Sequence, residues 1–200
     1  MILKNLLRVS FFSFLFFGLM TPAIAGKATN DVKETTDKIL ALLSDPKLKS
    51  PDKLADRRRM IRKEVDKRFD WSELSRRSLA RHWRKRTPEE RKEFIVLFGK
   101  LVERTYMDKI ESYTGEKIYY VGESIEGDYG VVKVKIVTRK NQEYLIHYRV
   151  KNKDNNWLVY DMSAEGVSLV NNYRVQFRDI LRKSSYQELV ERLKEKIAEE

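Results

Sequence analysis

The chain of 200 residues contains no cysteine. This absence excludes disulfide bonds, thiolate nucleophiles and thiolate metal ligands together. It also excludes a lipoprotein anchor, because the diacyl group of such an anchor is attached to a cysteine. Histidine is nearly as scarce, with only His82 and His147 present. The two are isolated and lack the spacing of HExxH or a similar motif, so we expect structural or surface roles for both and no metal site.

Long apolar runs are absent except near the start. There, Lys4 and Arg8 precede an apolar run over residues 9–20. Pro22 and a small-x-small sequence at residues 23–25 follow it. The run has about 12 residues, whereas a membrane-spanning helix needs roughly 20. This order of basic, apolar and small residues predicts a secretory signal peptide, with an uncleaved membrane anchor as the alternative.

We therefore expect residues 1–25 to be removed and residues 26–200 to form one mature domain outside the cytoplasm. No internal repeat, low-complexity segment or Pro/Gly-rich linker divides this domain. The formal charge of the chain is +11, of which Lys4 and Arg8 supply two units. A basic exported protein is expected to meet anionic lipid surfaces or acidic partners. Nucleic acid is not expected as a partner, because no RNP, zinc-finger or helix-turn-helix pattern occurs.

Helical periodicity dominates both ends of the domain. Asp70 with Glu73, and Thr87 followed by Pro88 and two glutamates, are strong signals for helix starts. The longest helix follows Thr87 and carries a wide aromatic stripe. The predicted helices cover residues 28–44, 51–69, 71–83, 88–113, 169–181 and 186–197.

Four strand candidates lie between these helical regions, at residues 117–125, 131–138, 143–150 and 156–162. Their short, turn-like connections indicate an antiparallel meander with one apolar and one basic-polar face. Strict alternation places Asp161 on the same face as Trp157 and Val159. The sequence thus predicts an α+β single domain, with a sheet of about four strands and helices before and after it packing on its apolar face.

Catalytic patterns are sparse. No GxSxG, P-loop or GxGxxG sequence occurs. Asp161 and Glu165 form the best carboxylate pair, at the end of the last strand. They either act as acid and base or, more simply, cap and charge-pair at the start of the next helix. The dense basic runs at residues 57–63 and 76–86 are either a solvated helix face or a docking surface for anionic headgroups or acidic partners.

The sequence NWLVYDMSAEGVSLV at residues 156–170, continued by NNYR and QF up to residue 177, carries a specific resemblance. Two earlier features agree with it: the segment Phe69-Asp70-Trp71, and the spacing of apolar and aromatic residues in the long helix after Thr87. The chain resembles the MlaC family, also called the toluene-tolerance auxiliary component of an ABC transporter, over nearly all of residues 28–195. These are periplasmic phospholipid-binding proteins of Gram-negative bacteria. One departure is Ala80, where the family often has glycine.

The resemblance implies helices and sheet packed around an apolar lipid cavity. It also implies a monomeric, non-enzymatic periplasmic carrier with no cofactor and with phospholipid as cargo. Its partners would be an outer-membrane lipoprotein–porin complex and an inner-membrane MCE-type ABC transporter complex. The side chains expected to line the cavity are Phe94, Phe98, Leu101, Tyr106, Val132, Val134, Ile136, Tyr144, Ile146, Tyr148, Val150, Tyr173 and Phe177.

Two alternatives of other classes remain at this point. A helix-and-sheet cone with a pocket is also typical of small isomerases and dehydratases, in which case Asp161 or His147 should face the cavity. The other alternative is an interaction module that has a filled core and binds acidic partners through its basic helices.

Overall fold

The computed structural model describes residues 26–199. Along this part of the chain, four α-helices precede the strands of a single sheet and two follow them. The predicted signal peptide, residues 1–25, lies outside the described residues. The helices are α1 (Lys27–Ser44), α2 (Leu54–Arg68), α3 (Trp71–Leu79), α4 (Pro88–Glu111), α5 (Leu169–Lys183) and α6 (Tyr186–Ala198). The strands are β1 (Lys117–Glu126), β2 (Tyr129–Val137), β3 (Glu143–Lys153), β4 (Asn156–Ala164) and β5 (Val167–Ser168).

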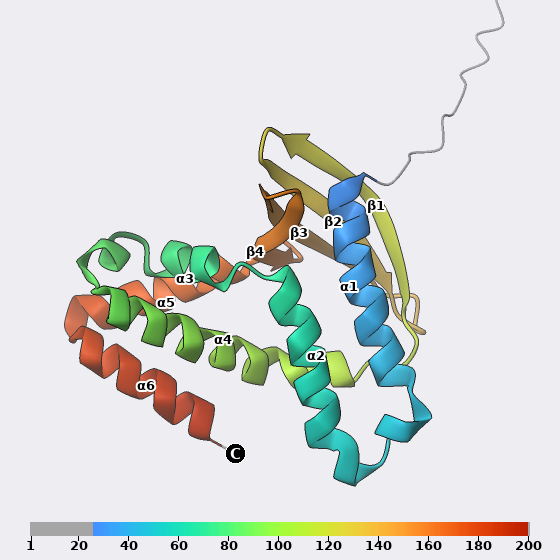
Figure 1. Ribbon diagram of the computed structural model, residues 1–200, viewed down its shortest axis with the longest axis horizontal. Coiled ribbons are helices and arrows are strands. Elements are labelled where there is room, and N and C mark those ends of the chain that lie inside the picture. The colour runs from blue at the N-terminus through green and yellow to red at the C-terminus, as the bar shows by residue number, and fades with distance from the viewer. Residues whose placement is uncertain (1–25, 200) are drawn as a thin grey trace, which may run out of the picture.

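The sheet is an antiparallel meander in the order β1-β2-β3-β4-β5. The prediction of an α+β domain is confirmed, and the sheet gains a fifth strand of only two residues. Helix α1 lies across one face of the sheet, while α3, α4, α5 and α6 form a helical layer beside it (Figure 1). Helix α2 lies between these two parts. The fold therefore contains two apolar interfaces, one under α1 and one inside the helical layer.

Capping groups predicted from the sequence fix the starts of several helices. At α4, Thr87 Oγ1 accepts a hydrogen bond from the Glu90 amide, and the Glu90 carboxylate accepts one from the Thr87 amide. Asp70 accepts from the Glu73 amide at the start of α3, and Ser185 caps α6 in the same way. Each such cap satisfies a backbone donor that a helix start leaves unpaired, and is worth about 1 kcal/mol.

The third predicted helix is shorter than expected. The apolar pattern predicts a helix as far as Trp83, but α3 ends at Leu79 and a 3-10 helix, η3 (Ala80–Lys85), follows. The backbone of Ala80 adopts φ 49° and ψ −123°, a combination that glycine tolerates and other residues rarely adopt. The chain therefore turns sharply at Ala80. Similarly, Pro51–Lys53 is a separate 3-10 turn before α2.

A β-bulge corrects the predicted faces of β4. The register between β3 and β4 shifts so that Arg149 pairs with Asp161 while Val150 pairs with Val159. Tyr160 is the extra residue, and every side chain after it changes face. Asp161 consequently lies on the face away from α1, and the following Met162 joins Val159 on the face toward α1. The prediction that Asp161 shares a face with Trp157 and Val159 is therefore wrong, because the inserted Tyr160 reverses the alternation of faces after it.

None of the helices within residues 26–199 is both long and apolar enough to cross a membrane.

Candidate functional site

The face of the sheet that carries α1 forms the first apolar cluster, named here the sheet cluster. Val132 and Val134 of β2 stand opposite Tyr148 and Ile146 of β3, as the antiparallel register requires. The amide of Trp157 donates to Asp31 of α1 at 3.0 Å and holds the helix against β4. The buried members of the sheet cluster are Ala28, Val32, Val132, Val134, Ile146, Val150, Trp157 and Val159.

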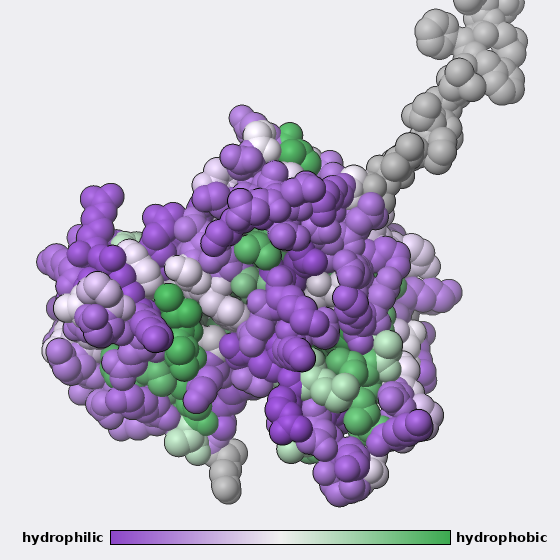
Figure 2. Space-filling view, viewed as in Figure 1, coloured by the Kyte–Doolittle hydropathy of each residue, from purple (hydrophilic) through white to green (hydrophobic). Residues whose placement is uncertain are grey.

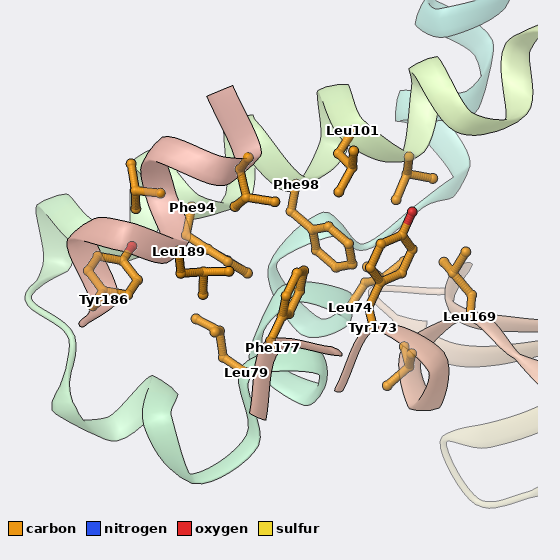
Figure 3. Packing of buried hydrophobic residues seen from close by; sticks show 14 residues of the cluster. Leu74, Leu79, Phe94, Phe98, Leu101, Leu169, Tyr173, Phe177, Tyr186 and Leu189 are labelled. Carbon is orange, nitrogen blue, oxygen red and sulfur yellow. The ribbon is translucent and has the colours of Figure 1, made fainter. Parts of the chain in front are cut away.

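The helical layer contains a second apolar cluster, named here the helix cluster. Phe98 lies at its centre, with ring centroids 4.9 Å from Tyr173 and 5.2 Å from Phe177 (Figure 3). Phe94 completes the aromatic group at 5.5 Å from Phe177. These side chains are at most 6% exposed, so they pack ring against ring as a filled core does. The other buried members are Leu74, Leu79, Leu101, Val102, Leu169, Val170, Tyr186, Leu189, Val190 and Leu193.

A seam separates the two clusters, and among residues 26–199 only Phe69 and Met162 pack against both. Phe69 is held there by backbone pairing with Val159, because the next amide, that of Asp70, donates to the Val159 carbonyl at 2.9 Å. Both side chains are only partly buried. A partly buried apolar boundary of two residues is a weak junction compared with either cluster.

Tyr148 lies on the sheet side of this seam, where it pairs with Met162 across β3 and β4. Burial, with a smaller contribution from Tyr120, raises the pKa of the Tyr148 hydroxyl to about 12. Its side chain nevertheless keeps partial exposure. Tyr106 of α4 is similar, since burial raises its pKa and it remains half-buried against the helix cluster. Both tyrosine side chains are thus desolvated by the surrounding protein while each keeps some contact with solvent.

Arginines of α2 join the helical layer to the rest of the molecule. Arg57 and Arg58 both bind the Glu111 carboxylate at the end of α4, at 3.0 Å and 2.6 Å. Arg62 reaches the Gly99 carbonyl at 2.9 Å and the Glu103 carboxylate at 2.8 Å. The first basic run is therefore divided: these three side chains hold α2 against α4, while Arg59 and Lys63 of the same run are exposed.

The same helix is tied to the sheet side at its other end. Arg68 donates to the Trp157 carbonyl at 2.9 Å and to Thr35 at 3.0 Å, and lies 3.6 Å from the Asp31 carboxylate. Helix α2 thus spans both clusters with guanidinium groups at each end. Long, planar arginine side chains suit this role because they form several directed hydrogen bonds at once.

The candidate catalytic groups have structural partners instead. Asp161 accepts hydrogen bonds from Ser168 Oγ at 2.7 Å and from the Val170 amide at 3.0 Å, which caps α5. Glu165 accepts from the Leu145 amide at 2.6 Å. His147 pairs with Lys133 across the strands, on the face away from α1. Of the three, none faces the apolar side of the sheet, so the geometry favours the capping interpretation over the enzyme alternative.

Three surface hollows, each of about 350–420 Å³, are lined mainly by charged and polar side chains; the space-filling view shows how much of the visible surface is hydrophilic (Figure 2). None of these three offers the apolar lining that an acyl chain requires. Within residues 26–199, no group of three or more histidine, aspartate and glutamate side chains is arranged to hold a metal ion. The seam, where partly buried apolar side chains contact both clusters, is the candidate functional site.

Comparison with known proteins now bears on this geometry. The model of the MlaC protein family matches residues 33–195. The chain belongs to the MlaC family. A curated relative, the intermembrane phospholipid transport system binding protein MlaC of Haemophilus influenzae, is 25% identical over 122 residues, covering 58% of this chain and 57% of the relative. The alignment thus spans little more than half of that relative's length.

A solved structure extends the likeness of this MlaC-family chain over most of its length. It is the phospholipid-binding protein of Ralstonia solanacearum in complex with a phospholipid, with a TM-score of 0.75 and 26% sequence identity. The match covers 86% of this chain and 98% of the other. The fold described above is therefore shared with a protein whose structure was solved in complex with a phospholipid.

The thirteen side chains predicted to line a cavity in this MlaC-family chain fall into separate places. Six belong to or pack against the sheet cluster: Val132, Val134, Ile136, Ile146, Tyr148 and Val150. Six belong to or pack against the helix cluster: Phe94, Phe98, Leu101, Tyr106, Tyr173 and Phe177. Tyr144 belongs to neither and is 41% exposed.

Sequence reasoning misses the two residues that join the clusters. Alternation places Met162 on the wrong face, because the bulge at Tyr160 leaves no mark in a period-two pattern. Helical periodicity makes Phe69 a helix terminus, whereas its pairing with Val159 connects residues far apart in the sequence. The Phe69-Asp70-Trp71 segment is a sign of the family, but nothing in its composition indicates a position between two cores.

Proposed function

We propose that this chain is a periplasmic phospholipid carrier that holds the acyl chains of its cargo at the seam between the sheet cluster and the helix cluster. Its membership of the MlaC family and its likeness to a phospholipid-bound structure carry the proposal. In this proposal residues 1–25 are a cleaved signal peptide. The lipid passes between an outer-membrane lipoprotein–porin complex and an inner-membrane MCE-type ABC transporter complex.

The physical need for such a carrier follows from the chemistry of the cargo. A diacyl lipid has about 28 chain methylenes, and exposing each to water costs roughly 0.8 kcal/mol. The total, on the order of 20 kcal/mol, makes unassisted passage through water negligible. A carrier must offer a site about as apolar as the bilayer, because a much better site would not release the lipid. Direction of transport then depends on the partner complexes.

The arrangement of the seam supports binding of the chains there. The sheet side offers Ile136, Ile146 and Tyr148 on one continuous face, and the buried Asp31 carboxylate beside this cluster is paired with Arg68 and the Trp157 amide. Met162 packs against both clusters, and Tyr106 lies partly buried on the helix cluster. We propose that these residues contact lipid, while the tightly packed rings around Phe98 form the rigid wall behind them.

Lipid entry requires the two clusters to separate at the seam. This separation exposes little apolar surface, because within residues 26–199 only Phe69 and Met162 pack against both clusters. The arginine contacts from α2 to α4 and to β4 stay in place, so the two clusters remain connected through α2 while the seam opens. In the proposed mechanism the acyl chains replace the contacts that Phe69 and Met162 make between the clusters. The headgroup remains in solvent at the outer end of the seam.

The direct test is to purify the protein from bacterial cells and identify bound lipid by native mass spectrometry or organic extraction. We expect copurifying phospholipid and uptake from vesicles. Protein that is free of lipid and takes up none from vesicles would overturn the carrier proposal. It would favour the filled-core interaction module instead.

A pair of neighbouring substitutions tests the location of the site. Ile146→Arg places a charge on the α1 face of β3 and should abolish lipid uptake, since an unpaired buried charge is costly. Leu145→Arg is the matched control, because Leu145 is 48% exposed on the opposite face of the same strand. Ile146→Trp fills space without charge and should also lower uptake. Folded Ile146 variants that bind lipid normally would refute the site.

A further inference from the structure

A basic hollow lies at the corner where α3 turns into η3 and α5 passes beside it. It has a volume of about 420 Å³ and is lined by Arg76, Arg77, Arg81, Arg84 and Arg174, together with Trp83 and Ala80. Among the described residues, no acidic side chain lines it. The lining residues come from three elements, so the concentration of charge is a product of the fold rather than of one helix face.

Charge in this hollow is only partly neutralised. Glu73 is shared by Arg76 at 2.6 Å and Arg77 at 2.7 Å. Arg81 and Arg84 are exposed and form no ion pair with any residue in the described part of the chain, 26–199. Several guanidinium groups therefore face solvent with at most one carboxylate among them.

Local geometry holds these arginines in place. Arg174 donates from Nε to the Arg77 carbonyl at 2.9 Å, which fixes α5 against the end of α3. The positive φ of Ala80 turns the chain so that Arg81 and Arg84 return to the same hollow. Strained backbone of this kind persists where the surrounding structure holds it, and it is concentrated at binding sites.

The basic surface continues onto the sheet. The Arg77 guanidinium lies 4.1 Å from the ring centroid of Tyr160, the bulge residue, and 6.0 Å from that of Tyr129. The Lys151 ammonium lies 5.4 Å from the centroid of the same Tyr129 ring, and Tyr129 is 41% exposed. Cations and amphipathic aromatic rings thus alternate from the hollow to the end of the sheet where the β1–β2 turn lies.

We infer that this corner docks the protein on anionic membrane surfaces, with a lipid headgroup phosphate entering the basic hollow. Planar guanidinium groups match phosphate oxygens in bidentate geometry. Exposed tyrosine and half-buried tryptophan suit the boundary between headgroups and acyl chains. The flanking cations can meet neighbouring anionic headgroups at the same time. This site differs from the proposed cargo site, because the seam is apolar and the hollow is charged.

Vesicle flotation tests the docking site. Vesicles of phosphatidylglycerol mixed with phosphatidylcholine should bind the unmodified protein at low salt and release it at high salt, because exposed charges are screened. Pure phosphatidylcholine vesicles should not bind it. Arg81→Gln with Arg84→Gln should weaken binding to anionic vesicles about 30-fold, since each cation near such a surface contributes about fivefold.

The matched control removes two charges elsewhere. Lys63→Gln with Lys100→Gln changes exposed lysines of α2 and α4 outside the hollow and should alter binding less than about threefold. Equal losses in the two double variants, or no binding by the unmodified protein, would overturn the inference. Ile146→Arg separates the two sites, because it should lose lipid uptake while it still docks on anionic vesicles.

Discussion

Replacing Ala80 with glycine should stabilise this protein, although glycine usually destabilises helical segments. The Ala80 backbone has φ 49° and ψ −123°, and its side chain is exposed. A residue other than glycine in such a region carries a strain of about 1–3 kcal/mol. Glycine removes this strain but loses about 0.5–1 kcal/mol more in conformational entropy on folding. The exposed methyl group contributes little packing, so its removal adds little to this cost.

The net gain in the free energy of unfolding is expected to be about 1 kcal/mol. For a domain of this size the corresponding rise in the midpoint of thermal unfolding is about 2–4 °C. Urea unfolding at constant temperature, followed by circular dichroism, measures the free energy directly. The slope with denaturant should stay unchanged if the substitution acts only on the backbone of the folded state.

Ala41→Gly provides the control for this prediction. Ala41 is exposed in α1, where the backbone is helical, so glycine should lower the free energy of unfolding by about 1 kcal/mol. Opposite signs at the two positions are the expected result. If Ala80→Gly destabilises the protein as much as Ala41→Gly does, the strain assigned to the α3–η3 turn does not exist.

Two further predictions concern charged groups. Glu111→Gln should lower the free energy of unfolding by about 1–3 kcal/mol, because Arg57 and Arg58 lose a shared carboxylate of low exposure. Asp37→Asn, the control, breaks an exposed ion pair of α1 and should change the free energy of unfolding by less than about 0.5 kcal/mol. Equal effects of the two substitutions would contradict the conclusion that α2 holds α4 in place through Glu111. Glu73 has its pKa lowered from 4.5 to about 2, first by its hydrogen bond with Arg76. The stability that ionised Glu73 contributes is therefore complete above pH 4.5 and is lost as the pH falls toward 2. The Glu73→Gln variant should accordingly lose less stability than the unmodified protein over this pH range. An unchanged dependence of stability on pH would refute the assigned role of Glu73.

Local signals in the sequence are sufficient for most of the fold. The caps at Thr87, Asp70 and Ser185 depend on residues within one helical turn, and all three form. Only Thr87 and Glu90 complete a reciprocal capping box; the boxes predicted for Asp70 with Glu73 and Ser185 with Glu188 form only the side-chain half. The meander follows from short turns between alternating strands, because such turns leave no room for a crossover. These features are encoded by neighbours along the chain.

Features that depend on tertiary pairing are not accessible in this way. The Arg57–Glu111 ion pair joins residues 54 positions apart, and a basic run looks the same whether its partners are solvent or another helix. The bulge at Tyr160 reverses the faces of β4 without any special residue type. The end of α3 before Ala80 is unexpected because alanine normally favours helix. The departure from the glycine of the family pattern at this position is the one feature of the sequence that indicates a break.

The candidate site is predictable in composition but not in arrangement. Alternation along β2 and β3 correctly assigns Val132, Val134 and Ile146 to one apolar face. It does not reveal that the aromatic stripe of α4 packs into a different cluster from that face. Periodicity identifies which side of an element is apolar, whereas the choice of partner depends on the path of the whole chain.

The helix cluster is assembled from two stretches of chain on either side of the sheet. Helices α3 and α4 precede the strands, and α5 and α6 follow them, yet Phe98 packs against Phe177 across this whole interval. During synthesis, α3 and α4 therefore emerge with their aromatic face uncovered, and they stay so until the sheet and both final helices have followed. Ordering of this core is a late event that closes a long loop, which slows folding. A chain that lacks α5 and α6 would expose the aromatic face of α4 and should aggregate rather than fold.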